Sequence, residues 1–185
     1  MPKKFEKEFI SYCEIQNLEV NPNQIKVIKK LEDYHNSNYK SFFSKLFSKQ
    51  KTKKGFYLYG GVGVGKTMIL NFFYDHLEEK KLKKHFNEFM LGFHDFVHEQ
   101  KEKNEENVIN QFVKNLKSKA SLVYFDEFQV TNIVDAMILG KLFEQIFKED
   151  IKIILTSNTK ISELYKEGLQ REQFIPFIKI MEDQS

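Results

Sequence analysis

Short apolar runs alternate along this chain with stretches in which apolar residues recur every three or four positions. Uninterrupted runs predict strands over 56–59, 121–125 and 151–156, and 85–90 is predicted as a further strand. Recurrence at helical spacing predicts the helices, which cover 66–79, 91–101, 108–119 and 133–147, with a short one over 161–166. Buried strands that alternate with helices are typical of a parallel sheet with helices on each side. The pattern therefore predicts an α/β fold of three layers.

The first 54 residues are predicted to form a helical segment ahead of this core. Asn21 and Pro22 read as a helix cap followed by a first-turn proline, and apolar residues follow at helical spacing. A further helix is predicted over 39–49, and a lysine-rich connector then leads into the first core strand. We therefore divide the chain into an N-terminal helical segment, 1–54, and a core, 55–185.

Composition and charge indicate one globular core and disfavour several classes of protein. The 185 residues carry a net charge of +3, which is too small to favour nucleic acid or an anionic membrane as a partner. The sequence contains no run of about 18 apolar residues, which is the length needed to span a bilayer. The start of the chain does not resemble a secretory signal. A single cysteine, Cys13, fits a reducing compartment.

The strand at 56–59 breaks into a glycine-rich loop that leads directly into the next predicted helix. Gly60, Gly65, Lys66 and Thr67 occupy the defining positions of the phosphate-binding pattern G-x-x-x-x-G-K-T. Glycines let successive backbone N–H groups turn inward around an anion at the positive end of the helix. Lys66 is expected to reach the β- and γ-phosphates of ATP, and the Thr67 hydroxyl to bind Mg²⁺. The residues expected to hold the nucleotide are Gly60, Gly61, Val62, Gly63, Val64, Gly65, Lys66, Thr67 and Met68.

Two later strands end in polar residues that suit the same chemistry. The run 121–125 leads into Asp126 and Glu127, and the run 151–156 is followed closely by Asn158. Because parallel strands end at one edge of the sheet, these residues are expected near the phosphate loop. We expect Asp126 to hold Mg²⁺, Glu127 to act as the base on the attacking water, and Asn158 to reach that water or the γ-phosphate. A strand must also end in something polar, and Asn is a common helix cap, so structural roles stay open.

Arg171 is the single arginine in a chain with 28 lysines. A guanidinium is planar and forked, and it can bind a phosphate through two parallel hydrogen bonds, which an ammonium group cannot do. The single arginine therefore suggests a role in binding phosphate. The alternative is that codon bias alone explains why the chain has so few arginines.

Three strand ends in the order phosphate loop, Asp-Glu and Asn are the layout of an AAA+ ATPase. A closer resemblance lies in five segments: YLYGGVGVGKT (57–67), HFNEFM (85–90), FDEFQVTNIVDAMILGKLFE (125–144), ILTSN (154–158) and LYKEGLQREQFIPFI (164–178). In these segments the chain resembles the ZapE/AFG-type ATPase family of bacterial cell division and mitochondria. The segment before them, with Asn23 and Gln24 at the head of a helix, is only weakly similar. The resemblance implies a P-loop NTPase core of the AAA+ type that hydrolyses ATP with Mg²⁺ and remodels protein partners.

The resemblance also implies an assembly and a place in the cell. It implies that Arg171 is an arginine finger that reaches from one subunit into the neighbour's nucleotide, within a homo-oligomeric ring. It implies a protein substrate such as the tubulin-like division protein FtsZ, or membrane complexes under quality control in mitochondria. The location that follows is the bacterial cytoplasm, with peripheral association at the inner membrane or division site, or the mitochondrion in a eukaryote.

The chain departs from the family pattern in three places. Val64 stands where relatives usually carry Arg, and Asn132 where they usually carry Asp. Both lie outside the expected catalytic set, so these departures concern partner contact rather than hydrolysis. Relatives continue past the segment that matches 174–178 into another core strand and a helical lid. We therefore expect this chain to be a fragment of a longer protein, with the last strand and the lid missing.

Other classes of P-loop protein stay open as alternatives. A helicase-loader-like, DNA-associated AAA+ protein would need a basic face, for which the mixed-sign charge is weak support. A small-molecule kinase would usually need several arginines around the transferred phosphoryl group, and a GTPase would need an Asn-Lys-x-Asp motif, which the sequence lacks. His94 and His98 have the spacing of half a metal site, but without a convincing third ligand they are predicted to be structural.

Overall fold

A computed structural model of the chain describes residues 4–39, 52–100 and 104–185. The helix predicted over 39–49 falls almost wholly outside these residues. The chain forms two compact units. One consists of Met1–Lys53 with Gly63–Glu78, and the other of Lys54–Val62 with Glu79–Ser185. They are called here the helical unit and the sheet unit.

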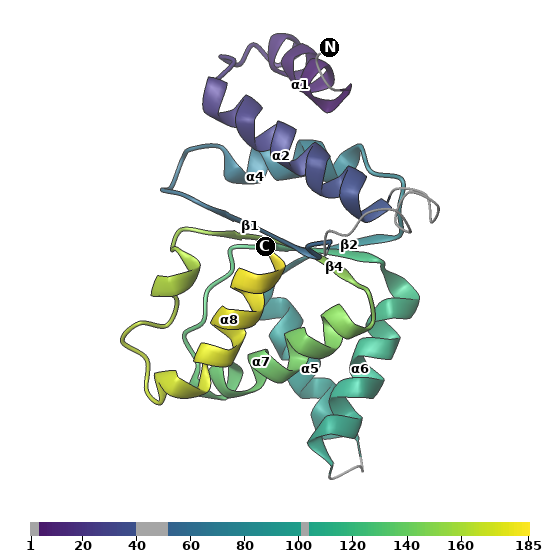
Figure 1. Cartoon of the computed structure of the whole chain (residues 1–185), viewed down its shortest axis with the longest axis vertical. Coiled ribbons are helices and arrows are strands. Elements are labelled where there is room, and N and C mark those ends of the chain that lie inside the picture. Colours follow the sequence, from purple (N-terminus) through teal and green to yellow (C-terminus); the bar gives the residue numbers. More distant parts are fainter. Residues whose placement is uncertain (1–3, 40–51, 101–103) are drawn as a thin grey trace. The chain divides into compact units, whose positions relative to one another are not determined.

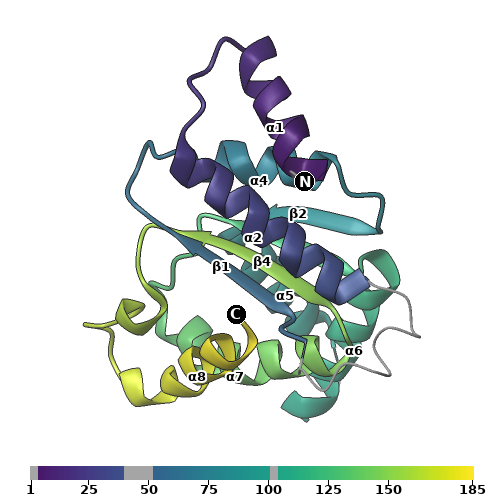
Figure 2. The same cartoon turned by 45° about the horizontal axis from the view of Figure 1, so that its top comes forward.

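The helical unit contains α1 (Lys4–Ile15), α2 (Pro22–Tyr39) and α4 (Lys66–Asp75), which can be followed in Figure 2. Aromatic side chains hold α1 against α4, with the rings of Phe5 and Phe73 5.3 Å apart and those of Phe9 and Phe72 5.0 Å apart. Helix α1 was not predicted from the sequence, although its buried residues, Phe5, Phe9 and Cys13, recur at four-residue spacing.

The ends of α2 and α4 follow from local chemistry. At the start of α2, the Asn21 side-chain oxygen accepts a hydrogen bond from the backbone N–H of Asn23 at 2.9 Å, and Pro22 opens the helix as predicted. Helix α4 ends at Asp75 rather than at the predicted residue 79. There the backbone N–H of His76 turns to the carbonyl of Phe73, only three residues back, which closes the last turn.

Among the described residues, the sheet unit is built on four parallel strands in the order β1-β4-β3-β2. The strands are β1 (Gly55–Tyr59), β2 (Lys81–His85), β3 (Leu122–Asp126) and β4 (Lys152–Ser157). Strands β3 and β4 are central and are buried along their whole length, as their continuous apolar sequence predicts. The predicted α/β fold with a parallel sheet is therefore confirmed.

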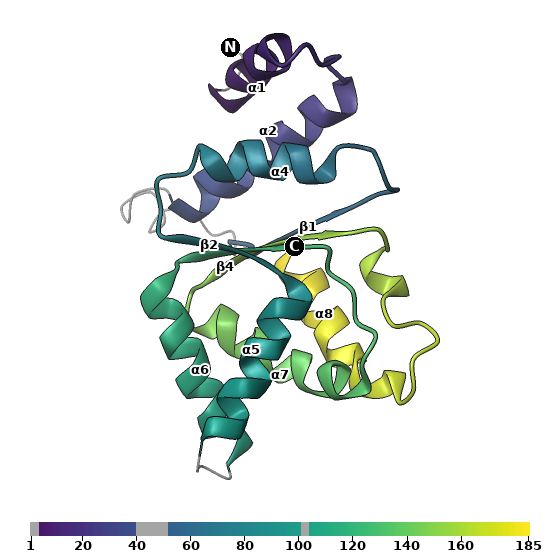
Figure 3. The ribbon, with the colours of Figure 1, turned by 180° about the vertical axis from the view of Figure 1, so that it is seen from behind.

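In the part of this unit that the structure describes, four helices lie on the same face of the sheet, as Figures 1 and 3 show from opposite sides. They are α5 (Phe86–Glu99), α6 (Glu105–Lys119), α7 (Ile133–Lys148) and α8 (Ile175–Gln184). Aromatic rings join the last two helices to the loop after β3, since Phe177 stacks on Phe128 at 5.3 Å and meets Phe143 edge-on at 4.9 Å. This packing fixes the chain just after Asp126 and Glu127.

The strand predicted over 85–90 is wrong, because these residues begin α5, which also starts earlier than the predicted 91. The strand lies just before it, as β2, and its sequence KLKKH is polar because β2 is an edge strand that stays partly exposed. Residues Phe86, Phe89, Met90 and Phe93 recur at helical spacing and are buried. The helix predicted over 161–166 is a single 3₁₀ turn, Ile161–Glu163, and a second such turn covers Arg171–Gln173.

No helix in the described part of the chain combines the length and the apolar character needed to cross a membrane.

Candidate functional site

The carboxyl ends of three strands form one edge in the sheet unit. Tyr59 at the end of β1 lies opposite Ser157 at the end of β4, and Gly60 continues the pairing with a backbone hydrogen bond to the Ser157 carbonyl at 3.2 Å. Strand β3 lies on the other side of β4 and ends at Asp126. The start of the glycine-rich loop and the predicted acid pair thus leave the sheet at the same edge, where α/β proteins bind their ligands.

Asp126 and Glu127 are held by one residue of the neighbouring strand, Thr156. The Thr156 hydroxyl donates to Oδ1 of Asp126 at 2.6 Å and accepts the backbone N–H of Glu127 at 3.0 Å. The same N–H also lies 3.2 Å from Oδ1 of Asp126. Asp126 is only 5% exposed and Thr156 only 1%, so these bonds form away from bulk water and orient the carboxylate firmly. A fixed carboxylate is the kind of oxygen ligand that Mg²⁺ prefers.

Glu127 itself is exposed and has a left-handed backbone, with φ at 56°. A non-glycine residue in this region is strained, and such strain persists where the surroundings impose it, often at functional sites. The chain is fixed on both sides of Glu127. Asp126 before it accepts the Thr156 hydroxyl, and the Phe128 N–H after it donates to the Thr156 carbonyl at 2.7 Å. The structure therefore presents the Glu127 carboxylate from a rigid turn beside Asp126.

Asn158 follows β4 directly and is exposed. The chain around it is held by Ser157, whose hydroxyl donates to the Phe128 carbonyl at 2.9 Å, and by Tyr57, whose hydroxyl donates to the Thr159 carbonyl at 2.7 Å. Burial raises the pKa of Tyr57 to about 12, against a smaller lowering by its hydrogen bond with Ser157. Because β3 and β4 are neighbouring parallel strands, Asn158 lies at the same sheet edge as Asp126, as predicted.

In the helical unit, the second half of the glycine-rich loop runs straight into α4. Gly63 and Gly65 have left-handed φ angles of 80° and 85°, which explains the glycines at these two positions. Lys66 is the first residue of α4, and Thr67 follows it. Backbone N–H groups at a helix start favour an anion, so this end of α4 suits a phosphate. Val62 and Val64 are exposed, and Met68 is half-buried.

One further residue touches this part of the loop. The Gln24 side chain, from the first turn of α2, donates from Nε2 to the Val64 carbonyl at 3.2 Å. Sequence reasoning noted Gln24 only as the head of a helix, and it assigned no separate role to Thr156. Both bonds join residues that are far apart in sequence, by 40 and 30 positions, so no local pattern could have shown them.

Arg171 lies in the sheet unit, in the second 3₁₀ turn. Its Nη2 donates to the Ser162 carbonyl of the same chain at 2.8 Å, and its Nε is buried without a partner among the described residues. The neighbouring Leu169 is 76% exposed, so the segment that carries the arginine is at the surface. The role predicted for Arg171 across a subunit boundary stays a prediction.

The remaining predicted or unusual residues have local partners. His94 accepts or donates one short hydrogen bond, 2.6 Å, with Asp135 of α7, and the described residues contain no cluster of three metal-ligating side chains. Asn132, a departure from the family pattern, caps α7 by accepting the N–H of Val134 at 2.8 Å. Since Asp and Asn serve equally as caps, this change preserves the helix start.

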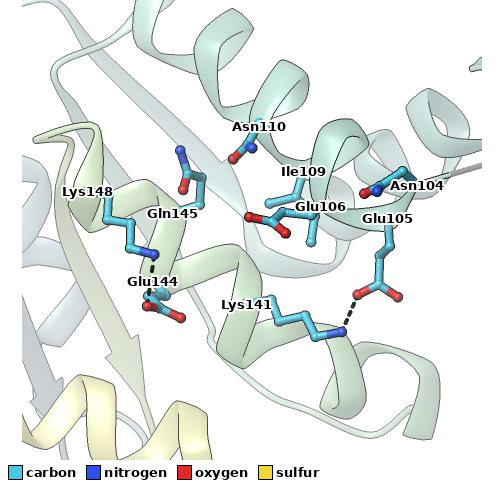
Figure 4. Close-up of a pocket in the computed structure, with 9 residues that line it drawn as sticks. All are labelled: Asn104, Glu105, Glu106, Ile109, Asn110, Lys141, Glu144, Gln145 and Lys148. Atoms are coloured by element: carbon cyan, nitrogen blue, oxygen red, sulfur yellow. Dashed lines mark hydrogen bonds and ion pairs between the residues drawn. The ribbon is translucent and has the colours of Figure 1, made fainter. Parts of the chain in front are cut away.

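A hollow of about 510 Å³ between α6 and α7 contains none of the predicted site residues. Figure 4 shows that polar and charged side chains line it, and that ion pairs join Lys141 to Glu105 at 2.6 Å and Lys148 to Glu144 at 3.0 Å. Its lysines are thus neutralised by acids, which makes it a poor site for phosphates.

Several solved structures share the fold of this chain. The crystal structure of DnaI superposes with a TM-score of 0.54 at 19% identity, over 90% of this chain and 85% of that one. The DnaC helicase loader gives 0.58 at 12% identity, over 90% and 89%. Domain III of DnaA from Thermotoga maritima gives 0.58 at 16%, over 88% and 62%. The fold and the phosphate-loop sequence together define a P-loop protein of the AAA+ type, as predicted.

Sequence relatives define the family. The model of the family described as AFG1-like ATPase matches residues 11–185. Lactation elevated protein 1 homolog B of Danio rerio is 39% identical over 161 residues, 82% of this chain and 32% of that protein. Cell division protein ZapE of Escherichia coli (strain K12) is 38% identical over 132 residues, 71% of this chain and 35% of that protein. The chain therefore belongs to the AFG1-like ATPase family, and it spans about a third of the length of these relatives.

Proposed function

We propose that this chain is the nucleotide-hydrolysing core of an AAA+ ATPase. The observation that carries the proposal is the arrangement at the end of β3. There, Thr156 fixes the buried Asp126 carboxylate and also the strained turn that presents Glu127. Strain and buried hydrogen bonds at a strand end are expected where a protein must hold two carboxylates for separate tasks. The phosphate-loop sequence and the family membership support the same function.

Each residue has a chemical role in this proposal. Lys66 and the N–H groups of Gly60–Thr67 hold the phosphates of ATP, while Thr67 and Asp126 hold Mg²⁺, whose bound charge offsets the charge on the phosphates. Glu127 accepts the proton of the attacking water. Asn158 donates from its side-chain amide to that water or to the γ-phosphate.

We propose further that subunits assemble and that Arg171 completes the site of a neighbouring subunit. Arg171 would then exchange its bond to Ser162 for two parallel bonds to a γ-phosphate, which its forked guanidinium permits. The partner is a protein that the ATPase remodels. The name of the Escherichia coli relative points to cell division, with a location in the bacterial cytoplasm at the division site. FtsZ is the partner to test first, and a mitochondrial role is the counterpart in a eukaryote.

The proposal is tested by nucleotide binding to the full chain with Mg²⁺, measured by calorimetry or with a fluorescent ATP analogue. Lys66→Ala should remove the binding of ATP, because the ammonium group that meets the phosphates is lost. Lys26→Ala is the matched control, since Lys26 is an exposed lysine of α2 in the same unit. If Lys66→Ala binds ATP as tightly as the control, the loop is not the nucleotide site.

A further inference from the structure

Gln24 makes a contact with the phosphate loop that the proposed function does not use. Its Nε2 donates to the carbonyl oxygen of Val64 at 3.2 Å. The same nitrogen would lie only 2.6 Å from a Cβ atom built on Gly65. The side chain therefore packs against both residues of one peptide group, at the point where the loop enters α4.

This contact determines which way that peptide group faces. The peptide bond between Val64 and Gly65 is trans, so its C=O and N–H point in opposite directions. With the C=O held toward Gln24, the N–H of Gly65 is left on the opposite side, away from α2. Gly65 has a left-handed φ of 85°, and glycine rotates about its backbone at little cost, so the loop alone holds this peptide weakly.

The second half of the Gln24 amide gives independent support. Its Oε1 is buried and has no hydrogen-bond partner among the described residues. Leaving a buried acceptor unpaired costs about 1–3 kcal/mol, so the bond through Nε2 is the polar contact that favours this placement of the amide. The reverse orientation of the amide would set Oε1 against the Val64 oxygen, and two acceptors repel. Only the orientation that donates to the loop is attractive.

We propose that Gln24 is a positioning residue for nucleotide binding. It holds the Val64–Gly65 peptide so that the Gly65 N–H stays available to a phosphate oxygen. Without this hold the peptide can turn over and present its carbonyl, which repels phosphate. The inference rests on the proposed function, because it assigns the loop to a polyphosphate. It also makes the position of α2 a determinant of nucleotide affinity.

The test compares Gln24→Met with the wild-type full chain. Methionine fills similar space but donates no hydrogen bond. A hydrogen bond of this kind is worth about 0.5–1.5 kcal/mol, so the dissociation constant should rise by about 2- to 13-fold. The factor should be the same for ATP, GTP and tripolyphosphate, since the loop binds phosphates rather than the base.

Gln24→Glu should bind all three less tightly still, because its carboxylate faces a carbonyl and repels the phosphates. The adjacent exposed amide gives the control, Asn23→Ala, which should bind as the wild type does.

Each outcome of this test is distinct. If Gln24→Met binds all three ligands as tightly as the wild type, while Lys66→Ala binds none, the inference is overturned and the proposed function survives. If only ATP binds more weakly, Gln24 contacts the base, and the positioning role is wrong. If the wild-type chain binds no polyphosphate, the proposed function fails and the inference fails with it. Thermal unfolding of Gln24→Met is measured alongside, and a loss of affinity with an unchanged melting temperature is the expected result.

Discussion

Glu127 is the residue at which local preference and proposed function conflict most clearly. A glutamate with φ at 56° is strained, and glycine would adopt this conformation more easily. Thr156 holds the turn on both sides, because its hydroxyl donates to Asp126 and its carbonyl accepts the N–H of Phe128. The sequence alone placed Asp126 and Glu127 at a strand end, but it could not show this strain, which arises from a neighbouring strand.

This strain predicts a stability gain that is separate from catalysis. Glu127→Gly should be more stable than Glu127→Ala by about 1 kcal/mol, because alanine keeps the strained φ and glycine relieves it. Both substitutions remove the carboxylate, so both should lack hydrolysis. Urea unfolding of the two variants side by side measures the difference. Equal stabilities, or a more stable Glu127→Ala, would show that the turn is not strained.

At the scale of elements, sequence pattern predicted the strands with continuous apolar runs better than the polar strand β2. Strands β3 and β4 were predicted within one or two residues because their continuous apolar runs have the length of a buried strand. Strand β2 was missed because an edge strand with three lysines among its five residues lacks an apolar run. The apolar spacing of α5 was read as a strand, since HFNEFM is short and rich in aromatic residues. Pattern alone cannot separate a short buried strand from the first turns of a buried helix.

The buried hydroxyl of Tyr57 in β1, which donates to the carbonyl of Thr159 just after β4, predicts a pH dependence of stability. Burial raises the pKa of Tyr57 to about 12, so the folded protein keeps this proton at a pH where the unfolded chain, with a tyrosine pKa of about 10, has lost it. The stability linked to this proton is full below about pH 10 and is lost as the pH rises toward about 12. Tyr57→Phe has no such proton. Over this range the unfolding free energy should therefore fall more steeply for the wild type than for Tyr57→Phe. Parallel declines in denaturant unfolding would contradict the burial effect.

At the scale of the whole molecule, the glycine-rich loop is where the chain passes from one compact unit to the other. Residues up to Val62 belong to the sheet unit, and Gly63 onward to the helical unit. The family resemblance correctly indicated the fold and the family, both of which were found. The contact of Gln24 with the loop was not foreseen, because it joins residues 40 positions apart in the sequence and forms only on folding.

The proposed ring makes Arg171 and Glu127 contribute to the same nucleotide from different subunits. Arg171→Ala retains the phosphate loop but offers no finger, and Glu127→Gln offers the finger but lacks the base. Alone, Glu127→Gln should hydrolyse ATP at least about 10²-fold more slowly than the wild type, and Arg171→Ala about 10³- to 10⁵-fold more slowly. Arg171→Lys should restore little, because an ammonium group cannot form the two parallel bonds.

The most direct measurement is therefore the steady-state ATP turnover of the full chain, for each variant alone and for the two mixed. The account predicts two inactive variants whose mixture regains activity, because some Arg171→Ala subunits then receive a finger from a Glu127→Gln neighbour. If the mixture stays inactive while the wild type assembles and turns over, Arg171 does not act across a subunit boundary. If Glu127→Gln alone turns over at the wild-type rate, Glu127 is not the base, and the central claim is contradicted.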